Sequence, residues 1–370
     1  MTFKNYTNNY FKILFISILF IVSFNVIMKS YYTNRPFMAL LKKPSSIIIG
    51  TSTANFGLDP KHNNLVSDHY YSIPVGGVKN KLVWIKRFDS LNDLENVVLC
   101  LDFFEYNSYR EVKNINSGSI DNLFLIILNL FKELFSIDSF IYSVKKYFHK
   151  TSEIVLENGH VWLKDYTAIH TFKAIKIDEI ETHLPKPGKK FSIYSHNNYS
   201  KLIYLKEIIN YCIHNNINLV MIIPPRHMAM TEIERTLGLN KDFENWKIEL
   251  VDLINNFSNQ QQPDLWAFSL MNEITTEKLP ENKIANMNWF RDRLHFTENL
   301  GDYVLDVIFG NNDMESLPEN FGVKIDTYNI DHHLSVNDSI TQEFRNKNII
   351  YLDRLRSNVK ITLNSYMGYK

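Results

Sequence analysis

Short apolar segments alternate with longer amphipathic segments along most of this chain. The apolar segments have the length and composition of buried strands. They cover residues 46–50, 70–74, 96–101, 218–223 and 264–270. Helical patterns lie between them, at residues 78–89 and 200–215. Strands that are separated by helices pair in parallel, and a parallel sheet is covered on both faces. The alternation therefore predicts an α/β fold, a three-layer sandwich with a mainly parallel sheet.

The composition is that of a folded protein with a large core. The 370 residues are 45% hydrophobic and 22% charged. Basic and acidic residues number 40 each, so no net field favours nucleic-acid binding. The two cysteines, Cys100 and Cys212, fall in an expected strand and an expected helix and are predicted to be small buried side chains. We expect one α/β domain at residues 45–310, with an insertion at about 150–195, and a C-terminal extension at 311–370.

The N-terminus carries a separate apolar stretch. Residues 13–28 are almost wholly apolar and are bracketed by Lys12 and Lys29. If Lys12 reaches to the interface, the stretch approaches the roughly 20 residues that cross a bilayer. No small-x-small cleavage site follows it, which favours an uncleaved transmembrane helix within residues 1–32 over a signal peptide. Residues 33–44 then form a linker. A buried core helix is the alternative.

Several residues that suit binding or catalysis come directly after predicted strands. In a parallel sheet covered by helices, ligands bind at the carboxyl ends of the strands. The residues placed at this edge are Ser52, Gly76, Asp102, Arg226 and His227. Arg226 and His227 follow a Pro-Pro stop and are candidate substrate contacts, although they could also simply close a loop.

One of these residues has chemical partners far along the chain. Residues 50–52 form a Gly-x-Ser turn that would present the Ser52 hydroxyl, and Asp292 lies three residues before His295. A serine hydroxyl becomes a useful nucleophile when a base takes its proton, and an imidazole oriented by a carboxylate supplies that base. The three residues therefore predict the catalytic triad of a serine esterase or acyltransferase. Taken alone, Ser52 would be an ordinary turn residue and His295 an ordinary surface or core histidine.

Three blocks of the sequence resemble a known family, the SGNH (GDSL-type) hydrolases. The blocks are residues 49–54 with 57–60, residues 72–77, and residues 292–295 with 300–302. They are similar in particular to a membrane-anchored bacterial branch of the family that is associated with cell-envelope O-acylation. The resemblance implies an SGNH or flavodoxin-like sheet, with Ser52 and His295 as nucleophile and base. It also implies that a backbone carbonyl could replace Asp292 with little loss.

The chain departs from this family where a side chain would bind the oxyanion. The family usually has an asparagine after the third strand, where this chain has Asp102, followed further on by Asn107. An ionised carboxylate cannot donate a hydrogen bond. We therefore expect an oxyanion hole built from two backbone amides, that of Ser52 and that of Gly76 or Gly77, which have no side chain to keep a substrate away.

The resemblance also implies a location and partners. The globular domain would lie outside the cytoplasmic membrane and act on a cell-envelope glycan, with an acetyl group as the expected acyl group and a membrane-bound O-acyltransferase as a possible partner. Basic residues on the two sides of the apolar stretch favour the opposite orientation. No cofactor motif is present, and the histidines lack the spacing of a metal site. The alternative is a non-catalytic protein of this fold that binds glycan or partners an acyltransferase.

Overall fold

The structure is a computed structural model. It describes residues 12–13, 16–21, 23, 39–40, 42–66, 69–110, 153–163, 175, 177–184, 191–257, 262–280, 287–310, 317–318 and 320–368. Half of the predicted membrane helix at residues 13–28 lies outside these residues, as do a heavily apolar helix and an amphipathic helix that the sequence pattern predicts at 120–135 and 139–149. Within the described residues, no helix combines the length and the apolar character needed to span a membrane.

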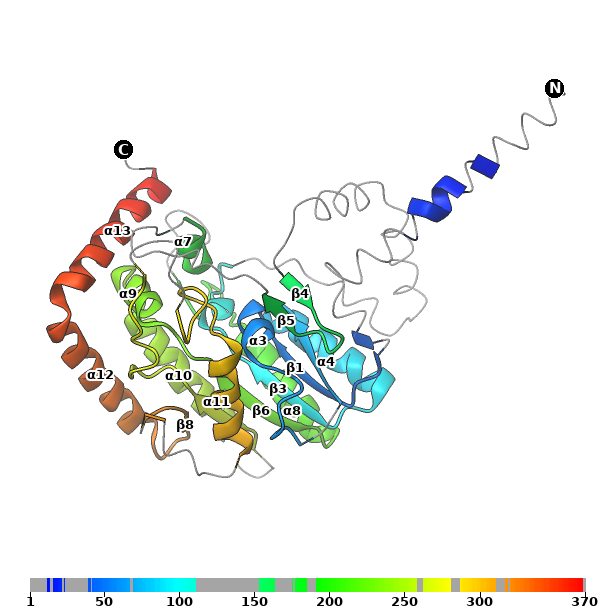
Figure 1. Ribbon diagram of the computed structural model, residues 1–370. Helices are drawn as coiled ribbons and strands as arrows, with labels where there is room; N and C mark the ends of the chain where they lie inside the picture. Colours follow the sequence, from blue (N-terminus) through cyan, green and yellow to red (C-terminus); the bar gives the residue numbers. More distant parts are fainter. Residues whose placement is uncertain are drawn as a thin grey trace, which may run out of the picture.

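A six-stranded sheet forms the centre of the protein (Figure 1). In spatial order its strands are β2 (Tyr70–Pro74), β1 (Ser46–Gly50), β3 (Asn96–Cys100), β6 (Asn218–Ile223), β7 (Asp264–Ala267) and β8 (Val323–Lys324). The first five run parallel, and β8 pairs with β7 in the antiparallel direction. The predicted α/β fold with a mainly parallel sheet is confirmed, with one antiparallel edge strand in addition.

Alternate residues of the central strands face two separate cores. Ile48, Val98 and Val220 belong to one apolar cluster, whereas Ile49 and Leu99 belong to the other. This division follows from the strand geometry, because successive side chains point to opposite faces. Strands buried on both faces read as continuous apolar runs, which is why these segments could be recognised in the sequence.

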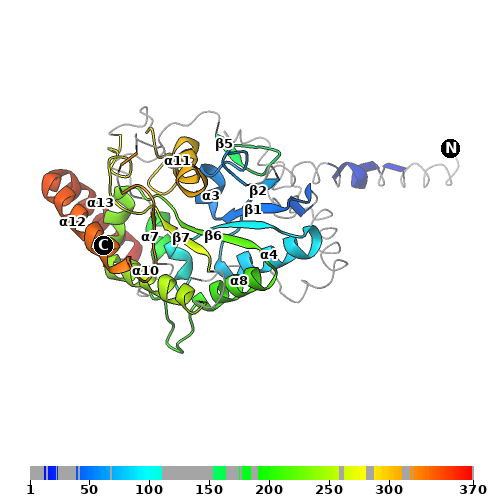
Figure 2. The ribbon, with the colours of Figure 1, turned by 90° about the horizontal axis from the view of Figure 1, so that it is seen from below.

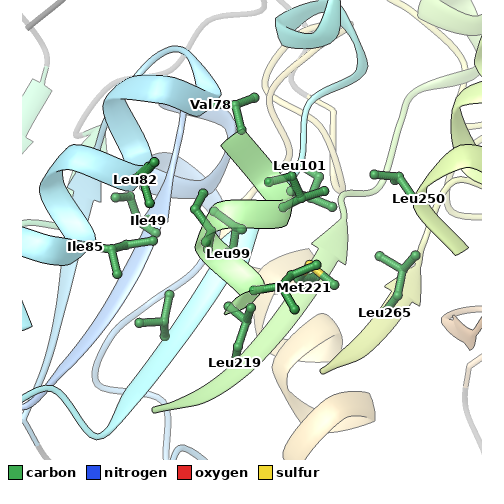
Figure 3. Close-up of a cluster of buried hydrophobic side chains, with 14 of the residues drawn as sticks. Ile49, Val78, Leu82, Ile85, Leu99, Leu101, Leu219, Met221, Leu250 and Leu265 are labelled. Carbon is green, nitrogen blue, oxygen red and sulfur yellow. The ribbon is translucent and has the colours of Figure 1, made fainter. Parts of the chain in front are cut away.

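Helices cover both faces of the sheet and complete three layers (Figure 2). One layer consists of α4 (Val78–Asn92), α8 (Leu202–His214) and α10 (Asn240–Asn255). Figure 3 shows side chains of α4 and α10 meeting those of the strands in this core. The opposite layer consists of α3 (Ser52–Gly57), α9 (Met228–Thr236), α11 (Glu298–Phe309) and α13 (Ile349–Met367).

Several element ends differ from the sequence-based expectation. Helix α4 continues past residue 89 to Asn92 and ends at Asp93, which adopts the left-handed conformation with φ 51°. Strand β7 stops at Ala267 rather than at residue 270, because a turn closed by the Thr275 hydroxyl on the Leu270 carbonyl follows it. Helix α11 begins after its N-cap Thr297, whose side chain accepts a hydrogen bond from the amide of Leu300.

The remaining elements come from the predicted insertion and the C-terminal residues. The region around 150–195 contains the hairpin of β4 (Glu153–Val155) and β5 (Val161–Leu163), followed by α7 (Ile177–His183). The C-terminal residues form α12 (Ile330–Lys347) and α13. Leu352, Leu355 and Val359 of α13 are fully buried in the core that also contains α9. The polar overall composition of this part of the chain concealed that narrow apolar stripe.

Helices α3 and α11 approach each other so closely that a pair of glycines is needed between them. A Cβ atom on Gly301 of α11 would lie 1.6 Å from the backbone oxygen of Gly57 at the end of α3. A Cβ on Gly57 would lie 2.0 Å from the ring of Phe296. Backbone atoms cannot move aside as a flexible side chain can, so a larger residue at Gly301 would push the helices apart.

We predict that Gly301→Ala lowers the free energy of unfolding by about 1–3 kcal/mol or more, because it overpacks this contact. Urea denaturation gives the measurement. Asn299→Ala is the matched control, because Asn299 is exposed on the same helix. It should change stability by less than about 0.5 kcal/mol. Equal stability of the two variants would contradict the close helix contact.

Candidate active site

The turn between β1 and α3 presents Ser52. Thr51 is the N-cap of α3, and its hydroxyl accepts a hydrogen bond from the amide of Thr53 at 3.3 Å. Ser52 is the first residue of the helix, and its side chain is exposed. The buried strand thus ends directly before an exposed hydroxyl, at the carboxyl edge where sites form in parallel sheets.

A short loop ahead of α11 carries Asp292 and His295. Phe290 and Phe296 pair across the base of this loop in an antiparallel bridge, and both rings are fully buried. The Asp292 carboxylate accepts hydrogen bonds from the amides of Leu294 and His295 at 2.7 and 2.8 Å. The loop backbone is therefore folded around the carboxylate, which fixes its position relative to the imidazole.

The structure brings the three residues of the predicted triad together. The Ser52 Oγ atom lies 2.8 Å from His295 Nε2, and His295 Nδ1 lies 2.7 Å from Asp292 Oδ2. With the imidazole proton on Nδ1, that nitrogen donates to Asp292 while Nε2 accepts from the serine hydroxyl. This is the hydrogen-bonded chain that a nucleophile, a base and an orienting carboxylate require.

Neighbouring side chains hold the histidine loop in place. The edge of the Phe56 ring meets the His295 ring at 5.2 Å between centroids. The guanidinium of Arg293 is fully buried and donates to both carboxylate oxygens of Glu179 on α7, at 2.7 and 2.6 Å. A bidentate, buried pair of this kind fixes orientation as well as distance. Neither Glu179 nor Arg293 was expected from the sequence, since nothing in their spacing relates α7 to the loop.

Ser52 lines an open pocket of about 520 Å³. The other lining residues come from the segments that follow β1, β2 and β3, from α7 and from the loop ahead of α11: Thr51, Pro74, Val75, Gly76, Gly77, Phe104, Glu105, Arg110, Thr182 and Leu294. The pocket combines apolar surface with one guanidinium group. Arg110 and Thr182 were not predicted as site residues, because neither stands directly after a strand.

Two backbone amides at the pocket are available to an oxyanion. The amides of Ser52 and Gly76 donate no hydrogen bond within the described part of the chain. A Cβ on Gly76 would meet nothing within 4 Å, so the space beside this residue is open. The amide of Gly77 instead donates to Glu105 Oε1 at 2.6 Å. Of the two glycines expected at the oxyanion hole, Gly76 is therefore the one with a free donor.

A buried ion pair supports the glycine turn. Lys81 Nζ donates to Glu105 Oε2 and to the carbonyl of Cys100, and both charged side chains are almost wholly buried. Burial disfavours the charged form of Lys81, but the carboxylates of Glu105 and Asp102 outweigh this effect and raise its pKa. Because Glu105 also accepts from Gly77, the pair ties α4 and the end of β3 to the pocket wall.

Asp102 does not stand beside Ser52 as an oxyanion donor. Its carboxylate is buried and accepts a hydrogen bond from the Thr51 hydroxyl at 2.6 Å. It is not among the residues that line the Ser52 pocket. Asn107 is also occupied elsewhere, since its side-chain amide donates to the carbonyl of His183 at 2.8 Å. The described residues therefore supply backbone amides, and no asparagine, at the candidate oxyanion site.

Arg226 and His227 are not brought to the Ser52 pocket. Arg226 donates to the Glu234 carboxylate and lies 4.3 Å from the Phe243 ring centroid, where it lines a separate cavity of about 20 Å³. His227 is fully buried as the N-cap of α9, with Nδ1 accepting from Ala229 and Nε2 donating to a carbonyl. Burial lowers the pKa of His227 to about 4. Both residues have structural partners, so the predicted substrate contact gains no support from their positions.

No cluster of potential metal ligands occurs among the described residues. His160 and His183 instead bind single carboxylates, those of Glu298 and Glu234.

We predict that Lys81→Met lowers the free energy of unfolding by about 3–5 kcal/mol at neutral pH, because it leaves the Glu105 carboxylate buried without its cation. Burial already raises the pKa of Glu105, and removal of Lys81 should raise it further. A group whose pKa is raised by folding stabilises the protein when protonated. The deficit should therefore be small near pH 4 and grow as the pH rises through the pKa of Glu105 in the folded variant.

Urea denaturation of Lys81→Met and wild type across this pH range gives the measurement. Lys79→Met is the control, since Lys79 lies on the same helix and is only partly buried. A pH-independent deficit, or one equal to that of the control, would contradict the role of the ion pair.

Comparisons of this chain with protein-family models, curated proteins and solved structures gave no match.

Proposed function

We propose that this protein is a serine esterase or O-acyltransferase of the SGNH type. The observation that carries the proposal is the hydrogen-bonded chain from Ser52 through His295 to Asp292, at an open pocket. Two free amides at the same pocket add support, because an acyl-transfer site needs donors for the negative charge that develops on the carbonyl oxygen.

In the proposed mechanism, Ser52 Oγ attacks the carbonyl carbon of an ester while His295 Nε2 takes the hydroxyl proton. The amides of Ser52 and Gly76 donate to the oxyanion, and Asp292 holds the imidazolium in place. When the bond to the alcohol breaks, His295 returns the proton to the departing oxygen. The acyl group, now an ester of Ser52, then passes to water or to a sugar hydroxyl, which His295 deprotonates in turn.

The substrate and location follow from the sequence resemblance. We propose an acetyl group as the acyl group and a cell-envelope glycan as its carrier. Residues 13–28 would anchor the protein in the cytoplasmic membrane, with the globular domain outside the cytoplasm, in the periplasm of a Gram-negative cell. A membrane-bound O-acyltransferase would be a suitable partner to deliver the acyl group.

A non-catalytic role is the second candidate. It is favoured by the acidic residue, Asp102, where the family has its oxyanion asparagine. A site with fewer donors is expected to be slower by about 10²–10³ for each donor lost. Such a protein would use the same pocket to bind glycan without turning it over.

We predict that the purified protein hydrolyses p-nitrophenyl acetate slowly, because the described residues offer the oxyanion two backbone amides and no side-chain donor. Ser52→Ala should reduce the rate by at least about 10³-fold, since it removes the nucleophile. Ser357→Ala is the control, because Ser357 is exposed on α13 and does not line the pocket. Labelling by a fluorophosphonate, located by mass spectrometry, should fall on Ser52.

Two results would contradict the catalytic proposal. Hydrolysis that persists in Ser52→Ala would assign the activity to another group. The absence of both hydrolysis and labelling in the wild type would favour the non-catalytic role.

We also predict that the full-length protein stays with membranes during a carbonate wash and is released by detergent. The reason is that residues 13–28 would bury their apolar side chains among the lipid tails. A chain that begins at residue 33 provides the control and should be released by the wash. Release of the full-length protein by carbonate would disprove the anchor.

A further inference from the structure

One charged side chain in the Ser52 pocket has no role in the proposed acyl transfer. Arg110 lines the pocket together with Ser52, Gly76 and Thr182. Taking the proposed function as the starting point, we infer that Arg110 forms an anion subsite and that the substrate carries a carboxylate close to the ester that Ser52 attacks.

The guanidinium of Arg110 is held in a fixed position. One terminal nitrogen, Nη1, donates to the carbonyl of Thr182 at 2.6 Å. The guanidinium carbon also lies 4.8 Å from the centroid of the Phe104 ring. A guanidinium has five N–H donors, and these contacts use one of them. A preorganised fork of this kind suits the planar, two-oxygen geometry of a carboxylate.

Arg110 has no direct ion pair in the described part of the chain. No described carboxylate lies within ion-pair distance of its guanidinium. Burial lowers the pKa of Arg110, and the charges of Glu105 and Asp102 oppose this, but neither carboxylate pairs with it directly: Glu105 binds Lys81 and Gly77, and Asp102 binds the Thr51 hydroxyl. A half-buried cation without an ion partner is costly to desolvate, so a bound anion would be favoured there.

A second basic side chain, that of Lys201, contacts the backbone of Arg110. Lys201 Nζ donates to the backbone carbonyl of Arg110 at 2.7 Å, and no ion pair to Lys201 occurs among the described residues. Burial, reinforced by the charge of Arg110, lowers the pKa of Lys201 to about 8. Arg110 is thus accompanied by a second basic group on this side of the pocket, where the one lining carboxylate, that of Glu105, is already paired with Lys81.

The carboxylate could belong to either part of an ester. On the alcohol side it would be the carboxylate of an acidic sugar, and on the acyl side it would be the far end of a dicarboxylic acyl group. Both present the same chemistry to Arg110, so the test needs one arm for each source.

The first arm measures binding. Full-length Ser52→Ala, which cannot turn substrate over in the proposed mechanism, is titrated in a calorimeter with a hexuronic acid oligosaccharide and with its carboxyl-reduced, neutral counterpart. We expect the acidic form to bind about 10- to 100-fold more tightly. Adding Arg110→Gln should abolish this preference, and Arg110→Lys should retain part of it. Lys360→Gln removes one charge from the exposed face of α13 and should leave the preference unchanged.

The second arm measures turnover. Hydrolysis of p-nitrophenyl acetate is compared with that of the p-nitrophenyl monoester of succinic acid, in wild type and in Arg110→Gln. If the carboxylate belongs to the acyl group, wild type should favour the succinyl ester in kcat/KM by about 10- to 100-fold. The variant should lose this selectivity.

The inference is overturned if neither arm shows a charge preference, or if the preference survives Arg110→Gln. Failure of the proposed function gives a different result. A charge preference in binding that depends on Arg110, without hydrolysis of either ester, would retain the anion subsite and refute the catalytic role. Hydrolysis that depends on Ser52, with no charge preference in either arm, would support the catalytic role and refute the anion subsite.

Discussion

The close contact between α3 and α11 is the constraint on which the candidate site depends. Ser52 begins α3, and His295 lies just ahead of α11, so the distance between their side chains is set by how closely these two helices approach. Gly57 and Gly301 allow backbone to meet backbone there, and the Phe296 ring packs beneath them. A hydrogen bond tolerates an error of only a few tenths of an ångström. The contact between Gly57 and Gly301 therefore controls the distance between the Ser52 and His295 side chains, although neither glycine is part of the triad.

Buried ion pairs fix the loops at the carboxyl edge of the sheet. Arg293 joins the histidine loop to α7, and Lys81 joins α4 to the segment after β3 that holds the Gly77 amide. Such pairs add little net stability, since each charge loses its hydration, but they are costly to break. Their effect is to favour one arrangement of loops that would otherwise be free to vary. A preorganised arrangement is what an acyl-transfer site requires.

Two groups of residues with different chemistry line the Ser52 pocket at this edge of the sheet. One wall presents the Ser52 hydroxyl and free amides, which suit a reacting carbonyl group. The other presents the Arg110 guanidinium beside Phe104, which suits a charged group that does not react. Binding energy from a remote group can position an ester for attack, so the two walls would act together. In the proposed mechanism, this positioning would compensate in part for an oxyanion site that lacks a side-chain donor.

Much of the sheet could be predicted because the sequence patterns that mark its strands are local. The apolar runs at β1, β2, β3 and β6 match the strands closely, since both faces of a parallel sheet are buried. The spacing of Asp292 and His295 also predicted their pairing, because both lie in one short loop. The apolar stripe of α13 was hidden within a polar segment, and its partner α9 lies far away in the sequence.

The sequence by itself predicted the alternation of the central strands with helices and the pairing of Asp292 with His295. Tertiary structure alone decided that the Gly77 amide binds Glu105, that Asp102 faces Thr51, and that Arg226 and His227 point into structural contacts. It also decided that Arg110 enters the pocket. Strand and helix patterns depend on neighbours a few residues away, whereas the use of each donor or charge depends on which distant group meets it after packing.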